Sequence, residues 1–115
     1  MNETVDIVIC SGYSPGARVL RAAVREISKR RPIRVVTVAP ALAQLPKAMD
    51  DMNGLKDRKV IVVDGCDGLC GLQVLMQFGV EPKGRLMMGP YYKVDEKGIV
   101  ETTRQIEALM DKVLQ

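Results

Sequence analysis

Residues 59–64 read Lys59-Val60-Ile61-Val62-Val63-Asp64, an almost unbroken run of β-branched residues that stops at Gly65. Similar apolar runs occupy Val5–Cys10 and Ile33–Ala39. A strand with one face in water alternates apolar and polar side chains, whereas continuous apolar runs are typical of strands covered on both faces in a parallel sheet. We therefore expect three buried parallel strands, and a shorter fourth strand at Arg85–Met88.

Helical signals lie between these strands. Ser14-Pro15 offers a helix cap and a first-turn proline ahead of an apolar stripe at helical spacing. Further helices are expected at about residues 46–54, 67–79 and 101–115. The alternation of strand and helix predicts a single domain over residues 1–115, a three-layer α/β/α fold with a four-stranded parallel sheet. Right-handed crossovers favour the strand order 2-1-3-4, in a Rossmann-like or flavodoxin-like arrangement.

The composition narrows the chemistry that the chain can perform. Its 115 residues are 47% hydrophobic and 27% charged, which excludes a disordered chain and a disulfide-dense mini-protein. The sequence contains no histidine, so it cannot form a Ser-His-Asp triad, a Cys-His dyad or a His-ligated metal site. Any chemistry must therefore come from the three cysteines, carboxylates, hydroxyls, lysines, arginines or backbone amides.

The termini and the charge pattern suggest where the protein acts. No apolar run approaches the ~18–20 residues that a membrane span needs, and the first residues are acidic where a signal peptide is basic. We expect a cytoplasmic protein that does not act at a membrane. The net charge of +3 is modest, and Arg18, Arg21, Arg25 and Lys29 form a stripe that we interpret as a solvated helix face. We do not expect a nucleic-acid partner, and the sequence leaves any protein partner open.

The three cysteines are expected to meet at one edge of the sheet. Cys10 ends the first strand, Cys66 follows the third strand by two residues, and Cys70 lies in the first turn of the next helix. In this strand order, ligands bind at the carboxyl ends of strands one and three, where the winding direction reverses. Residues scattered over the sequence should therefore face one crevice.

The surroundings of these cysteines favour thiolates. Two helix N-termini are expected at the same edge, and their unpaired N–H groups stabilise negative charge. Gly12 and Gly65 would let the backbone approach a bound group closely, and we expect Ser11 to support the site beside them. Buried cysteines often only fill space, but three at one rim favour a metal site, and the spacing Cys66-x-x-x-Cys70 falls within the range of zinc sites.

Two short motifs make the chain resemble the DGC-domain family, whose members are described as zinc-binding proteins. Cys10-Ser11-Gly12 matches the end of the family's first strand. Asp64-Gly65-Cys66, followed by Cys70, matches its Asp-Gly-Cys signature and the further cysteine that opens a helix. The resemblance covers roughly residues 5–90. It implies that Cys10, Cys66 and Cys70 are metal ligands and that Zn²⁺ is the cofactor.

The chain departs from the family pattern at the end of the second strand. Family members commonly carry another cysteine where this chain has Thr37-Val38-Ala39, so four thiolates are not available. A water molecule, Asp64 or Asp67 would then complete the coordination. Three protein ligands and an open position are typical of catalytic or exchangeable zinc sites, and thiolates also suit Cu(I) and iron–sulfur clusters.

Two functions without a resident metal remain open, and neither needs a cofactor. Cys10 lies where phosphocysteine carriers and low-molecular-weight phosphatases keep their nucleophile, but the first arginine, Arg18, comes too late for the phosphatase loop. Cys10 could instead act in thiol redox chemistry or sulfur transfer, with Cys66 or Cys70 resolving it. We favour metal binding over either enzymatic role.

Overall fold

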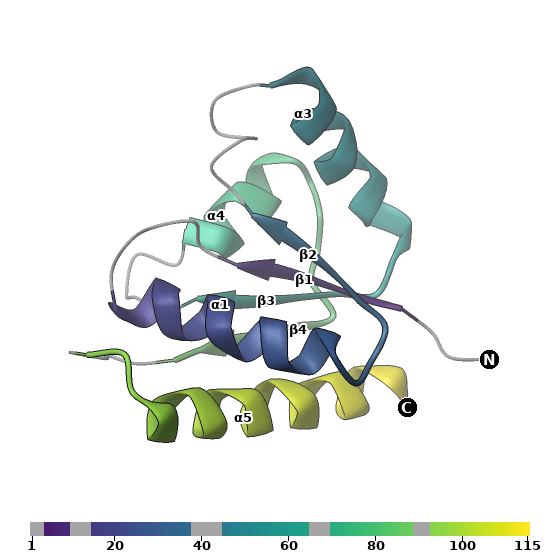
Figure 1. Ribbon diagram of the computed structural model, residues 1–115. Helices are drawn as coiled ribbons and strands as arrows, with labels where there is room; N and C mark the ends of the chain where they lie inside the picture. The colour runs from purple at the N-terminus through teal and green to yellow at the C-terminus, as the bar shows by residue number, and fades with distance from the viewer. Residues whose placement is uncertain (1–3, 10–14, 38–44, 65–69, 89–92) are drawn as a thin grey trace.

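The fold is a parallel sheet with helices on both faces (Figure 1). The computed structural model describes residues 4–9, 15–37, 45–64, 70–88 and 93–115. Their elements, in chain order, are β1 (Val5–Ile9), α1 (Pro15–Ser28), β2 (Ile33–Thr37), α3 (Pro46–Asn53), the 3-10 turn η1 (Gly54–Asp57), β3 (Val60–Asp64), α4 (Cys70–Gln77), β4 (Gly84–Met87) and α5 (Glu96–Leu114).

The strand order confirms the sequence prediction. The sheet runs β2-β1-β3-β4, and all three strand pairs are parallel. Ile9, the last residue of β1, pairs with Thr37 of β2 on one side and with Val63 of β3 on the other. The carboxyl ends of β1 and β3 therefore lie side by side, as the expected crevice requires.

Two of the three expected strands, β1 and β3, are buried on both faces, which is why they do not alternate. The expectation was wrong for β2, where no residue is buried because the strand lies at the edge of the sheet. Every residue of β1 and β3 is buried. Ile7 and Ile61 join the core under α1 and α5, whereas Val8 and Val62 join the core under α3, η1 and α4. Figure 1 shows the same division, with α1 and α5 on one face of the sheet and α3 and α4 on the other.

Short sequence signals mark where α4 ends and where α5 begins. α4 is followed by Gly79, which has a φ of 70°, and the N–H of Val80 reaches back to the carbonyl of Leu75 at 2.9 Å. The last helix begins at Glu96 and not near residue 101, so that expectation was wrong. The physical reason is a helix cap, because the Asp95 carboxylate accepts the N–H of Gly98 at 2.8 Å.

The longest helices of the fold are amphipathic surface helices. In the described part of the chain, no helix combines the length and the apolar character needed to cross a membrane.

Candidate functional site

The predicted site lies where β1 and β3 end. Ile9 and Val63 are neighbours in the sheet, Cys10 follows Ile9 in the chain, and Asp64 is the last residue of β3. Cys70 is the first residue of α4, so the structure places its backbone at the start of that helix. The other predicted residues lie outside the described residues: Cys10, Ser11, Gly12, Gly65, Cys66 and Asp67.

Asp64 ties the end of β3 to the first turn of α4. The residue is only 2% exposed. One carboxylate oxygen, Oδ1, accepts the N–H of Gly71 at 2.8 Å, and the other, Oδ2, accepts the N–H of Leu72 at 3.4 Å. The first N–H groups of a helix have no partner within the helix, so this carboxylate satisfies two of them and holds the residues that follow Cys70.

Gly71 makes this approach possible because it has no side chain. A Cβ at this position would lie 2.8 Å from Cγ2 of Val62 and 3.0 Å from Oδ1 of Asp64. Both distances are shorter than carbon atoms tolerate without movement. The helix start therefore packs directly on β3, and only glycine fits at the contact.

The charge on Asp64 is set by two opposing effects. Burial raises the pKa of Asp64 above its ordinary value because a charged carboxylate loses its hydration. The hydrogen bonds from Gly71 and Leu72 lower the pKa, but burial is the larger effect. The carboxylate thus remains more easily protonated than an exposed one, although both of its oxygens have donors.

A second buried acid lies near the amino ends of the strands, away from the predicted site. Asp6 is fully buried in β1, and its carboxylate accepts hydrogen bonds from Nε and Nη2 of Arg58, the latter at 3.2 Å. The hydrogen bond to Asp6 raises the pKa of Arg58. Sequence reasoning missed this pair, although an acid inside an apolar strand was a visible signal. The pair lies at the amino ends of the strands, so we assign it a structural role.

The described residues alone do not complete a metal site. Within the ranges that the structure describes, no group of three or more His, Cys, Asp or Glu residues is placed to hold a metal ion. The described residues supply a framework for such a site. It consists of the adjacent ends of β1 and β3 and the anchored start of α4, and the cysteine-bearing segments adjoin these elements in the sequence. Asp64 belongs to that framework, because its oxygens are engaged by backbone amides.

Comparison with known proteins agrees with the motifs and with the fold. The family model of the DGC domain matches residues 6–113, nearly the whole chain. Among solved structures, the chain resembles a diflavin flavoprotein A3 from Nostoc sp., with 12% identity, a TM-score of 0.51, and coverage of 99% of this chain and 95% of that chain. At that identity the likeness shows a shared three-layer α/β architecture alone. No curated protein matches the chain.

Proposed function

The chain belongs to the DGC domain family, and we propose that it binds one zinc ion through Cys10, Cys66 and Cys70. The observation that carries this proposal is the pairing of Ile9 with Val63, which brings the ends of β1 and β3 side by side. Each cysteine is close in sequence to one of the flanking elements, β1, β3 or α4. Their attachment to one edge supports a shared site.

The donor set suits zinc and leaves one position open. Three thiolates are soft ligands that bind zinc well, and the absence of histidine leaves cysteine as the only strong ligand for such a metal. A water molecule in the fourth position would make the ion exchangeable, or reactive as a Lewis acid. We therefore propose an exchangeable site rather than a closed structural one.

Asp64 supports this site by position. Its carboxylate holds the backbone N–H groups of Gly71 and Leu72, which directly follow Cys70. This contact holds the start of α4 against β3. Losing a residue that orients a metal ligand typically lowers metal affinity 10- to 100-fold.

The experiment that tests the proposal is metal analysis of native protein. The protein is purified without oxygen, chelator or a metal affinity column, and its metal content is measured by mass spectrometry together with the number of reactive thiols. We expect about one zinc per chain, with thiols that react only after a chelator removes the metal. Full metal loading in all three Cys→Ser variants would overturn the assignment of these ligands.

A remote variant controls for general damage to the protein. Ser28→Ala removes an exposed hydroxyl at the far end of α1, where it bonds only the carbonyl of Arg25. This variant should keep its metal, whereas Cys10→Ser, Cys66→Ser and Cys70→Ser should each lose most of it. Protein that holds no metal and has three freely reactive thiols would instead direct attention to Cys10 as a nucleophile or redox thiol.

A further inference from the structure

β2 is an edge strand that its neighbours leave uncovered. It lies at the end of the sheet and pairs only with β1 among the described strands. None of its five residues is buried, in contrast to β1 and β3, and Val35 is 39% exposed. Exposed edge strands offer unpaired N–H and C=O groups to another chain.

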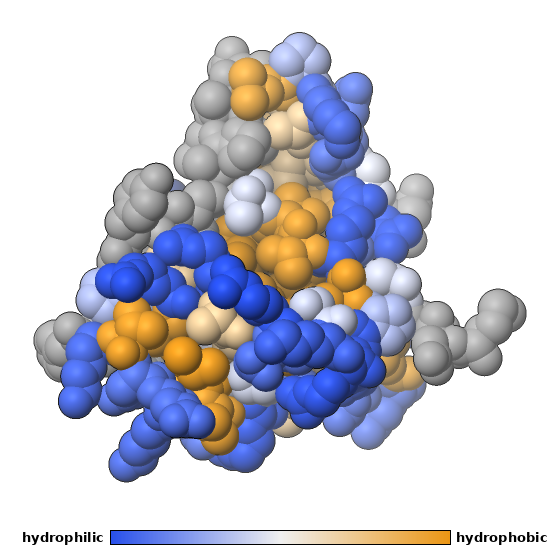
Figure 2. Space-filling view, viewed as in Figure 1, coloured by the Kyte–Doolittle hydropathy of each residue, from blue (hydrophilic) through white to orange (hydrophobic). Residues whose placement is uncertain are grey.

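An apolar hollow runs beside this edge. It has a volume of about 340 Å³ and lies between β2 and α3. Val35, Val36, Leu45 and Ala48 supply its apolar lining. Figure 2 shows the apolar surface over β2 between α1 and α3, with hydrophilic surface on either side.

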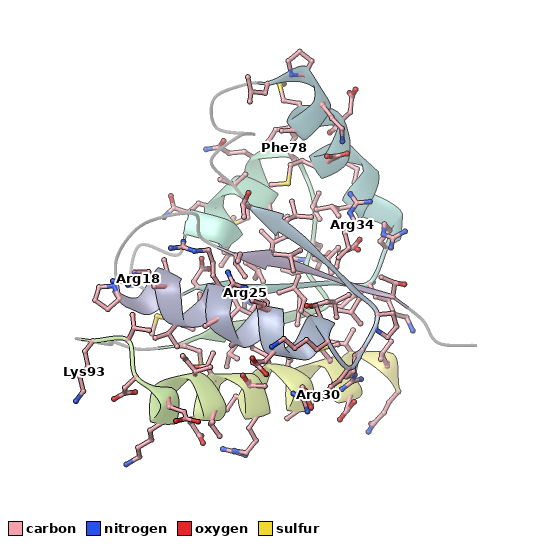
Figure 3. All side chains as sticks on the ribbon, in the orientation of Figure 1. Arg18, Arg25, Arg30, Arg34, Phe78 and Lys93 are labelled. Atoms are coloured by element: carbon pink, nitrogen blue, oxygen red, sulfur yellow. The ribbon has the colours of Figure 1, made fainter. Side chains whose placement is uncertain are left out.

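Cations flank β2 on both faces of the sheet. Side chains alternate along a strand, so Arg34 shares the α3 face with Val36, which packs on that core, and Lys47 lines the same hollow. On the other face, Arg18 and Arg25 are exposed on α1 and spaced two helical turns apart (Figure 3). α1 contacts β1, β2 and β3, whereas α5 contacts β3 and β4.

Arg25 lies on the solvent side of α1, away from the groove between α1 and α5. Glu26 and the following Arg30 line the groove between α1 and α5. Arg25 is 100° around the helix from Glu26, and it shares the opposite flank with Arg21. Figure 2 shows a hydrophilic band along α1 beside the apolar surface over β2.

The arginines around β2 differ from the other cations nearby. Lys47 is already paired, because its Nζ lies 3.5 Å from Oδ2 of Asp51, which also lines the hollow. Arg30 pairs with Glu107 of α5 at 2.5 Å, and Arg31 pairs with Asp111 at 2.8 Å. By contrast, Arg18, Arg25 and Arg34 form no ion pair within the described ranges. An anionic partner would therefore gain attraction without first breaking existing pairs.

We propose that the free edge of β2 is a docking site for an extended acidic segment of another protein. The segment would add a strand beside β2 through main-chain hydrogen bonds. Its apolar side chains would enter the hollow on the α3 face, and its carboxylates, which alternate with them, would lie on the other face near Arg18 and Arg25. A second copy of this chain is disfavoured, because it would bring two identical arginine-bearing surfaces into one interface, and juxtaposed like charges oppose association. The apolar lining favours a peptide over a nucleic acid.

A short synthetic peptide of alternating Glu and Val tests this proposal directly. The peptide is titrated into the full chain at low salt, and backbone amide shifts are followed by NMR. We expect saturable shifts at residues 34–37, weaker binding as salt is added, and no binding of a Lys-Val peptide of equal length. Arg18→Glu and Arg25→Glu should each weaken binding about tenfold or more.

Arg85→Glu is the matched control. Arg85 is an exposed arginine on β4, the opposite edge strand, and it also has no ion pair within the described ranges. This variant should bind the peptide as the parent protein does. Absence of binding, shifts located away from β2, or equal effects of Arg25→Glu and Arg85→Glu would each overturn the proposal. It also fails if a single-stranded oligonucleotide binds this surface more tightly than the peptide, or if the chain dimerises through β2.

Discussion

Replacing Gly71 by alanine should destabilise the protein by about 1–3 kcal/mol. The added Cβ would lie 2.8 Å from Cγ2 of Val62, which is 1% exposed on a strand packed on both faces and has no room to move. α4 would have to shift away from Asp64. Overpacking costs about 1–3 kcal/mol, and a weakened hydrogen bond to the carboxylate adds about 1 kcal/mol. The better helix propensity of alanine offsets about 1 kcal/mol.

Urea unfolding followed by far-UV circular dichroism measures this effect, and Gly54→Ala is its control. Gly54 has an ordinary right-handed φ of −69°, and an added Cβ there would meet no atom within 4 Å. That variant should unfold at the same urea concentration as the parent, or slightly later, by up to about 1 kcal/mol. If Gly71→Ala proves as stable as Gly54→Ala, then β3 and α4 do not pack as tightly as the structure indicates.

Three further outcomes follow from the buried and paired charges. Arg58→Met would leave the fully buried Asp6 unpaired, which should cost about 3 kcal/mol in urea unfolding; a loss below about 1 kcal/mol would mean that water reaches Asp6. Because burial raises the pKa of Asp64, the charged carboxylate destabilises the folded state. The stability of Asp64→Asn relative to the parent should therefore improve as pH rises above about 4. A trend in the opposite direction would contradict burial as the main effect on this pKa. Hydrogen bonding to Arg104 lowers the pKa of Glu101 from 4.5 to about 2, so its contribution to stability should be present above pH 4.5 and be lost as pH falls toward 2. A carboxyl NMR titration at low salt checks this value, and a midpoint near 4.5 would show that the contact with Arg104 does not persist in solution.

The fold could be predicted from the sequence because burial leaves a local signature. Strands covered on both faces must be apolar at every position, and the runs at Val5–Ile9 and Val60–Val63 meet this requirement. The parallel sheet and its order then follow from the short connections and the handedness of crossovers. The motifs Cys10-Ser11-Gly12 and Asp64-Gly65-Cys66 likewise indicated the DGC domain family, and the match to the family model confirms it.

Such patterns could not predict contacts between side chains that are far apart in the sequence. A pattern reports which face of an element is buried, but it does not report which distant side chain meets it. Asp6 and Arg58 are 52 positions apart, and nothing local to either residue indicates the other. The predicted strand order already placed Ile33–Thr37 at the edge of the sheet, but its apolar residues read as a buried strand, so its exposure was missed.

Sequence alone thus determined that this chain is a layered α/β protein of the DGC domain family, because hydrophobic periodicity and short motifs are local properties. The tertiary structure decided which backbone groups Asp64 contacts. The approach of α4 to β3 brings the N–H groups of Gly71 and Leu72 to its two oxygens. These contacts depend on where two elements pack, and packing is a property of the whole fold.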